Sequence, residues 1–149
     1  MLKFAKLDPN AISPLRKHPE DAGIDIFALQ DVTVWPFTFK VVHTGVTFSI
    51  PEGTFLLVKP RGRNNHLTGS GVIDAGYQGE VMIKVVNYTI KPLRIHAGDA
   101  IAQLVHLPVI CDPVLEVSSV EIHAKISQRG GSGGIHGGNK KFAGKLNDK

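Results

Sequence analysis

The 149-residue sequence has little of several common features, and each scarcity excludes a class of protein. Its single cysteine, Cys111, has no partner for an internal disulfide, so we expect a protein of a reducing compartment such as the cytoplasm. Because no apolar run approaches the ~18 residues of a membrane-spanning helix, we expect neither a membrane span nor a membrane partner. The segment 1–6 places a lysine on each side of one phenylalanine, which argues against an ordinary secretion signal.

The sequence has no basic stripe of the kind that nucleic-acid-binding proteins carry. Its formal net charge is +4, but the basic residues are scattered along the chain. The densest basic cluster is formed by Lys140, Lys141, Lys145 and Lys149. Basic pockets also suit small polyanions such as nucleoside triphosphates, so we expect a small-molecule partner and no nucleic acid.

Signatures of common cofactor sites are missing as well. The seven histidines show no metal-ligand spacing, and Cys111 lacks a second cysteine, which argues against a zinc site. Neither a Walker A loop nor the glycine pattern of a dinucleotide-binding fold occurs. A nucleotide site in this chain must therefore be built in another way.

Period-2 alternation of apolar and polar residues is the main structural signal. It occurs in the segments 32–34, 46–50 and 81–85, which we interpret as half-buried strands. Turn signals recur at short intervals, for example at 51–53, 60–62 and 97–99, and we find no long helical period. We predict an all-β fold, a distorted jelly roll or β-barrel of short antiparallel strands.

The composition changes near residue 128, and we divide the chain there into a β domain, 1–128, and a C-terminal arm, 129–149. Six of the ten residues from 129 to 138 are glycine. The simple interpretation is a flexible extension, because such a segment has no apolar face to bury. The functional interpretation is an arm that closes over an anion, with backbone N–H groups and Arg129 as donors.

The segment 71–79, Gly-Val-Ile-Asp-Ala-Gly-Tyr-Gln-Gly, is the most informative part of the chain. It places Asp74 at the end of a short apolar run and Tyr77 between two glycines. Glycine permits tight bends and close approach to the backbone, so a small molecule can lie here against Asp74 and Tyr77. Taken alone, an aspartate at a strand end is more often a turn cap than a catalytic base.

This segment resembles the third motif of the trimeric dUTP pyrophosphatases, the dUTPases, and four further motifs follow the family order. Segment 22–26, Ala-Gly-Ile-Asp-Ile, looks like the first motif, and segment 60–63, Pro-Arg-Gly-Arg, looks like the second. Segment 95–105 is similar to the fourth motif, and the glycine-rich segment 129–138 to the fifth. Each motif alone is weakly specific, but the ordered set covers nearly the whole chain.

The resemblance implies a dUTPase-like β-clip fold and hydrolysis of dUTP to dUMP and pyrophosphate, with Mg²⁺ as cofactor. It implies Asp74 as the general base and Asp25 as an indirect magnesium ligand through water. It also implies a homotrimer with active sites between subunits. The substrate-binding residues that it implies are Arg61, Gly62, Arg63, Thr68, Val72, Ile73, Tyr77, Met82, Gln103, Arg129, Gly133 and His136.

Several positions depart from the family pattern. Gly62 stands where the second motif carries a phosphate-binding serine, and Thr68 stands where an asparagine is common. The aromatic residue that covers uracil in the fifth motif aligns with Gly134, so Ile135 or His136 would have to take its place. The interval from Arg61 to Asp74 is also shorter than usual. These departures concern recognition of the base more than hydrolysis.

Two other functions remain open from the sequence. A dCTP deaminase shares the fold, but its chemistry needs a glutamate ten residues after the aspartate, where this chain has Lys84. A non-catalytic trimer that binds a nucleotide and signals is the other alternative. Single residues also have simpler interpretations: Asp25 as a strand-edge carboxylate and Arg61 as a member of a surface ion pair.

Overall fold

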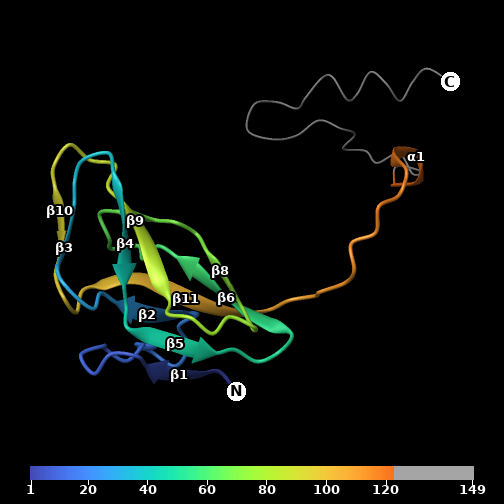
Figure 1. The fold of residues 1–149 in the computed structure, drawn as a ribbon, viewed down its shortest axis with the longest axis horizontal. Coiled ribbons are helices and arrows are strands. Elements are labelled where there is room, and N and C mark those ends of the chain that lie inside the picture. The colour runs from blue at the N-terminus through green and yellow to red at the C-terminus, as the bar shows by residue number, and fades with distance from the viewer. Residues whose placement is uncertain (123–149) are drawn as a thin grey trace. The chain divides into compact units, whose positions relative to one another are not determined.

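The computed structural model describes residues 1–122, and the chain forms two units, Met1–Cys111 and Asp112–Lys149 (Figure 1). The predicted boundary between residues 128 and 129 lies outside the described residues. The first unit contains the strands β1 (Lys3–Lys6), β2 (Gly23–Phe27), β3 (Val32–Val34), β4 (Phe39–His43), β5 (Val46–Ser49), β6 (Thr54–Lys59), β7 (Leu67–Thr68), β8 (Val72–Asp74), β9 (Met82–Val86), β10 (Leu93–Ile95) and β11 (Ala100–Pro108).

These strands form antiparallel sheets, and β11 lies inside the largest of them, which has the order β2-β11-β6-β8. A second sheet has the order β4-β9-β7, and the pairs β1-β5 and β3-β10 complete the unit (Figure 1). The predicted all-β fold of short antiparallel strands is therefore confirmed. The only helix in the described part of the chain is the four-residue α1 (Ser119–Ile122).

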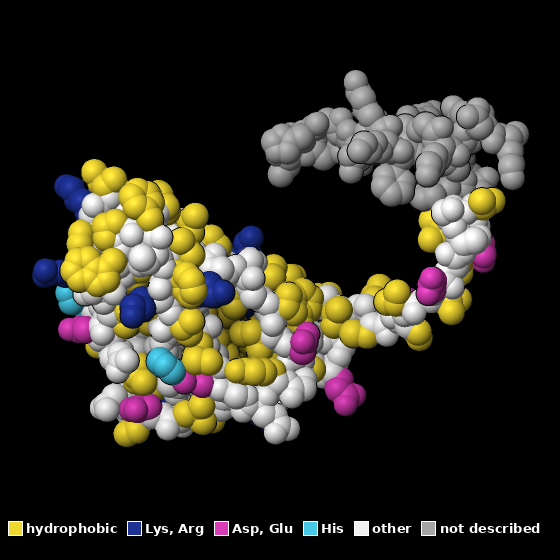
Figure 2. Space-filling view, turned by 45° about the horizontal axis from the view of Figure 1, so that its top comes forward, with side chains coloured by type: hydrophobic (Ala, Val, Ile, Leu, Met, Phe, Trp, Pro, Cys, Tyr) yellow, Lys and Arg dark blue, Asp and Glu magenta, His cyan; other side chains and the backbone are white. Residues whose placement is uncertain are grey.

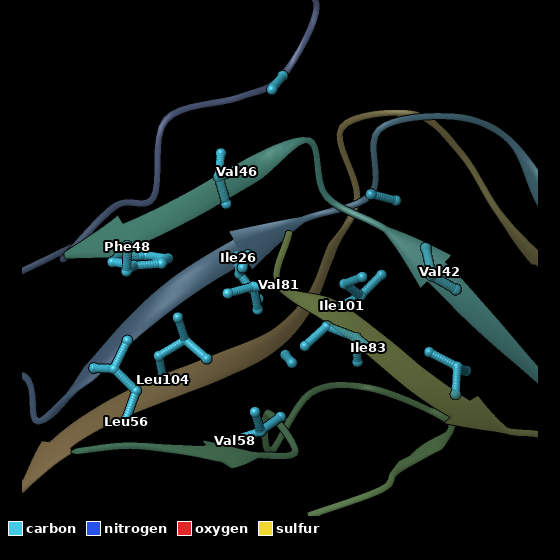
Figure 3. Close-up of a cluster of buried hydrophobic side chains, with 14 of the residues drawn as sticks. Ile26, Val42, Val46, Phe48, Leu56, Val58, Val81, Ile83, Ile101 and Leu104 are labelled. Carbon is cyan, nitrogen blue, oxygen red and sulfur yellow. The ribbon is translucent and has the colours of Figure 1, made fainter. Parts of the chain in front are cut away.

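The alternating segments became strands because one side of each can enter a shared core. In β5, Val46 and Phe48 are buried, whereas Ser49 is exposed. In β9, Ile83 and Val85 are buried, and Met82 and Lys84 point outward. Figure 3 shows the resulting core, in which side chains from both larger sheets meet, including those of Ile26, Val42, Leu56, Val81 and Leu104.

The β3–β4 and β9–β10 turns are tied together by the buried Asn87. Its side-chain Nδ2 donates to the carbonyls of Val34 at 3.0 Å and Lys91 at 2.7 Å, and its backbone N–H donates to Thr38 at 3.0 Å. In the first of these turns Phe37 has a φ of 57°, in the left-handed region that favours glycine. A bulky side chain there indicates local backbone strain.

Hydrophobic side chains remain on the surface of the first unit (Figure 2). On the outer face of the β4-β9-β7 sheet, Phe39, Val41, Leu67 and Met82 are all exposed. In the second unit, residues 112–122 likewise bury no side chain fully. Among the described residues, no helix has the length and apolar character to cross a bilayer.

Candidate active site

The first candidate pocket lies between β8 and β9 and has a volume of about 370 Å³. It is open on one side and combines apolar walls with backbone from the 69–71 turn. Of the residues predicted to bind substrate or catalyse, it brings together five. Its lining residues are Val58, Gly69, Ser70, Gly71, Val72, Ile73, Asp74, Tyr77, Glu80, Val81, Met82 and Lys84.

Asp74 is the last residue of β8, and its carboxylate is exposed at the pocket. Pairing of β8 with β6 fixes this position, because Asp74 lies opposite Phe55. The chain then turns, with the Tyr77 N–H donating to the Asp74 carbonyl at 3.0 Å. A β-carbon at Gly76, inside this turn, would meet no atom within 4 Å, so no packing contact requires glycine at this position.

The Tyr77 ring folds back over the loop that follows it. Its hydroxyl donates to the Glu80 carbonyl at 2.8 Å, and 42% of the residue is exposed. Gly79 makes this possible, because a β-carbon there would lie 2.5 Å from the hydroxyl oxygen. One face of an aromatic ring is thus held at the pocket by the chain's own backbone.

The Glu80 side chain turns away from Tyr77 toward the β4–β5 turn. Its Oε1 accepts the N–H groups of Thr44 and Gly45 at 3.0 and 2.8 Å, and its Oε2 lies 2.8 Å from His43 Nδ1. Partial burial by itself would raise the pKa of Glu80. The hydrogen bonds from His43, Gly45 and Thr44, together with the His43 charge, outweigh burial and hold that pKa below its ordinary value.

The second candidate pocket, of about 350 Å³, is polar and contains three cationic side chains, which suits an anion. It shares no lining residue with the first pocket. Five predicted site residues meet here, from segments far apart in the sequence. The lining residues are Lys17, Asp21, Ala22, Gly23, Asp25, Arg61, Gly62, Arg63 and Gln103.

Arg61 is oriented in this pocket by Asp25. Its Nε and one terminal nitrogen contact the two carboxylate oxygens at 2.8 and 2.9 Å, and both side chains are largely buried. Gln103 is held by a 2.9 Å hydrogen bond from its Nε2 to the Pro60 carbonyl, and it lies against the bare backbone of Gly23. Arg63 and Gly62 are exposed beside them, and a β-carbon at Gly62 would meet nothing within 4 Å.

The donor set of the second pocket fits a magnesium ion held through water, not a protein cage. Within residues 1–122, no group of three or more His, Cys, Asp or Glu side chains gathers as a metal site. Each Asp25 oxygen accepts one hydrogen bond from Arg61, and a carboxylate oxygen can accept a second from a water molecule. Magnesium keeps several waters and takes few carboxylates when it binds with phosphates.

Within residues 1–122, Thr68 is the one predicted site residue that lines neither pocket. Thr68 pairs with Val85 through β7, and its hydroxyl is buried without a hydrogen-bond partner in the described part of the chain. Its place beside Gly69 keeps it next to the first pocket without lining it. Arg129, Gly133 and His136 lie outside the described residues.

Sequence reasoning missed Lys17, Asp21, Glu80 and Lys84 as lining residues. Lys17 and Asp21 precede the first motif in a segment without periodicity, so no sequence signal placed them near Arg61. Glu80 directly follows the third motif, and this adjacency was the one sequence signal that could have placed it at the pocket. No helix occurs between Arg61 and Asp74, where a shortened connection was expected.

The antiparallel β framework of residues 1–111 thus carries a largely apolar pocket with a carboxylate at its rim and a separate polar pocket with three cationic side chains. A family model described as dUTPase matches residues 9–135. The deoxyuridine 5'-triphosphate nucleotidohydrolase of Corynebacterium jeikeium (strain K411) is 39% identical over 140 residues, 89% of each chain. The chain belongs to the dUTPase family.

Further relatives and solved structures agree. The deoxyuridine 5'-triphosphate nucleotidohydrolase of Mycobacterium tuberculosis (strain ATCC 25618 / H37Rv) is 37% identical over 143 residues, 91% of this chain and 92% of the relative. A variant of the Staphylococcus bacteriophage 80alpha dUTPase with dUpNHpp has a TM-score of 0.79 at 30% identity, covering 87% and 94% of the two chains. A dUTPase variant from phage phi11 of S. aureus, which coordinates a structural Mg(II) ion, has a TM-score of 0.75 at 30% identity, covering 80% and 97%.

Proposed function

We propose that this protein is a dUTP diphosphatase, which hydrolyses dUTP to dUMP and pyrophosphate. The observation that carries the proposal is the exposed carboxylate of Asp74 at the rim of a half-apolar pocket, in a member of the dUTPase family. Such a reaction would keep uracil out of DNA and supply dUMP for thymidylate synthesis. A reducing cytoplasm, which the lone Cys111 favours, is the expected location.

Asp74 acts as the general base. It accepts a hydrogen bond from a water molecule, orients it and takes its proton as the water attacks. The attack cleaves the bridge between the α and β phosphates. One product, dUMP, takes up the hydroxyl of the water, and pyrophosphate leaves. Arg61, Arg63 and Gln103 stabilise the negative charge that spreads over the phosphates, and Arg129, Gly133 and His136 of the arm complete the contacts.

The first pocket holds the nucleoside. Val72, Ile73 and Met82 supply apolar contacts to the uracil ring, and backbone groups of the hairpin at 68–72 read its polar edge. The Tyr77 ring packs under the sugar and leaves no room for a 2′-hydroxyl, so a clash selects deoxyribose.

Magnesium, when bound, would clamp the phosphates and neutralise part of their charge. Asp25 would hold it through water, since its carboxylate lines the cationic pocket and already orients Arg61. Asp25 and Arg61 would therefore act together: Asp25 would hold the magnesium ion through water, and Arg61 would bind the phosphates.

A homotrimer with shared active sites is the proposed assembly. The supporting observation is that the two pockets share no residue, although one substrate must reach both the Asp74 carboxylate and the Arg61 cation. Phe39, Val41 and Leu67, exposed apolar side chains on the outer face of β4-β9-β7, also form a surface that suits a partner. A neighbouring copy of the chain would cover them and bring the two kinds of pocket together.

A pyrophosphate-release assay with Mg²⁺ over dUTP, dCTP, dTTP and UTP tests the function. We expect rapid release from dUTP and little from the others. Release of ammonia from dCTP, measured in parallel, would instead indicate the deaminase, whose required carboxylate is replaced by Lys84 at the pocket. Tight binding of dUTP without turnover would indicate a signalling protein.

A further inference from the structure

One side chain of the loop that carries Tyr77 attaches this loop to the β4–β5 turn. Residues 75–80 leave β8 and return to β9, and two N–H groups of the β4–β5 turn donate to the Glu80 carboxylate from 35 and 36 residues away. His43 provides a third contact at 2.8 Å. Hydrogen bonds to an ionised carboxylate are about twice as strong as neutral ones, so this is the strongest side-chain attachment of the loop.

The same residue holds the Tyr77 ring through its backbone. The Tyr77 hydroxyl donates to the Glu80 carbonyl at 2.8 Å, and the absent side chain of Gly79 lets the ring approach. The neighbouring attachments, from Thr47 Oγ1 to the Gly79 carbonyl and from Val81 N to the Val46 carbonyl, hold the same loop from β5. The β4–β5 turn, which holds the Glu80 carboxylate, thus contributes to the position of the ring.

We infer that Glu80 is a positioning residue for sugar selection. Its carboxylate attaches the loop to the β4–β5 turn, and its carbonyl accepts the Tyr77 hydroxyl and so positions the ring at the pocket. The inference deepens the proposed function and rests on it. Glu80 touches no reacting atom. It acts through Tyr77: it keeps the ring in place, so that the ring can exclude a 2′-hydroxyl when a nucleotide binds.

The position of the Tyr77 ring must be fixed, because the ring can exclude a ribose only if the 2′-hydroxyl cannot push it aside. One 2′-hydroxyl adds a single oxygen atom, and a ring displaced by about 1 Å would accommodate it. If the Glu80 carboxylate is removed, Thr44 and Gly45 lose their acceptor. The loop keeps its attachments to β5 but loses its restraint at the β4–β5 turn, so the Tyr77 ring is held less firmly. The expected loss is therefore in discrimination more than in the chemical step.

The test compares kcat/KM for UTP and dUTP in Glu80→Ala, Tyr77→Ala and the double variant, with Glu52→Ala as a matched control at an exposed turn. We expect Glu80→Ala to raise the UTP/dUTP ratio about tenfold. We expect no further increase on the Tyr77→Ala background, since the ring through which Glu80 acts is gone. Glu52→Ala should leave the ratio at the wild-type value.

Two further variants keep the test decisive if Glu80→Ala folds poorly. His43→Ala removes one of the three carboxylate contacts and should raise the ratio slightly. Glu80→Gln retains an oxygen acceptor for Thr44 and Gly45 and should restore most of the discrimination. An unchanged ratio in folded Glu80→Ala and His43→Ala overturns the inference alone, as does an equal change on the Tyr77→Ala background. A wild-type protein that hydrolyses no dUTP overturns the proposed function and the inference with it.

Discussion

Asp25 and Arg61 form a bidentate ion pair at 2.8 and 2.9 Å, with 19% and 27% of their side chains exposed. The pair joins β2 to the turn after β6 at the edge of the cationic pocket. Because Arg61 is held in this way before any anion binds, its remaining donors need not be ordered when a phosphate arrives.

Removing either partner should destabilise the fold. Asp25→Ala leaves a partly buried guanidinium without its acceptor, and we expect a loss of about 2 kcal/mol in the free energy of unfolding, measured in urea. The double variant with Arg61→Ala should lose less than the sum of the single variants. Additive losses would show that the two side chains do not stabilise each other.

Asp74→Asn should keep the fold and the binding of dUTP but lower turnover by at least ~10², because an amide cannot take the proton of the attacking water. The measurement is single-turnover hydrolysis beside equilibrium binding of dUpNHpp. Retention of more than half of the wild-type rate would remove Asp74 from the mechanism.

Deleting residues 129–149 should leave the melting temperature of the protein nearly unchanged, whereas turnover should collapse. The six glycines from 129 to 138 carry no apolar side chain for a core, but their N–H groups and Arg129 can surround phosphate oxygens. Steady-state kinetics beside thermal unfolding separates the two effects. Equal turnover with and without the segment would make it a simple extension.

Phe37→Gly should stabilise the protein. Phe37 has a φ of 57° and is 72% exposed, so glycine would relieve the backbone strain and remove little packing. We expect a gain of about 1 kcal/mol, seen as a higher urea midpoint with an unchanged slope. Phe37→Ala is the control, since it removes the ring but keeps a β-carbon; a gain of the same size there would assign the effect to the ring.

Stability should fall in mild acid partly through Glu80. Its folded-state pKa lies below the ordinary value, so the carboxylate contributes stability above about pH 4.5 and loses it as the pH falls through the folded pKa. Urea unfolding from pH 7 to pH 3 should therefore show a smaller loss in Glu80→Gln than in wild type. Parallel curves would indicate that Glu80 does not contribute to the acid sensitivity.

Local patterns predicted much of the framework. The segments 32–34, 46–50 and 81–85 alternate because one face of each strand enters the core, and the structure confirms β3, β5 and β9 there. By contrast, β1 is exposed along its whole length, so burial imposed no pattern on its sequence. The strand exists because its backbone pairs with β5, which no local signal records.

The motifs indicated which residues belong to a site but not how they are joined. Asp25 and Arg61 were assigned separate roles, and their bidentate pairing depends on strands that meet only in the folded chain. The same holds for Glu80, whose partners lie on the β4–β5 turn. The left-handed conformation of Phe37 was also hidden, because sequence patterns favour glycine at such a position.

The contact between Gly79 and Tyr77 restricts the order in which this sequence can change over evolutionary time. Any side chain at position 79 would begin 2.5 Å from the tyrosine hydroxyl, so the glycine cannot be replaced while the ring remains in place. A smaller residue at position 77 would open the space first and release position 79 afterwards. Substitution is therefore directional: in a lineage that has filled position 79, a tyrosine at position 77 cannot take its present place over the loop until that side chain is lost again.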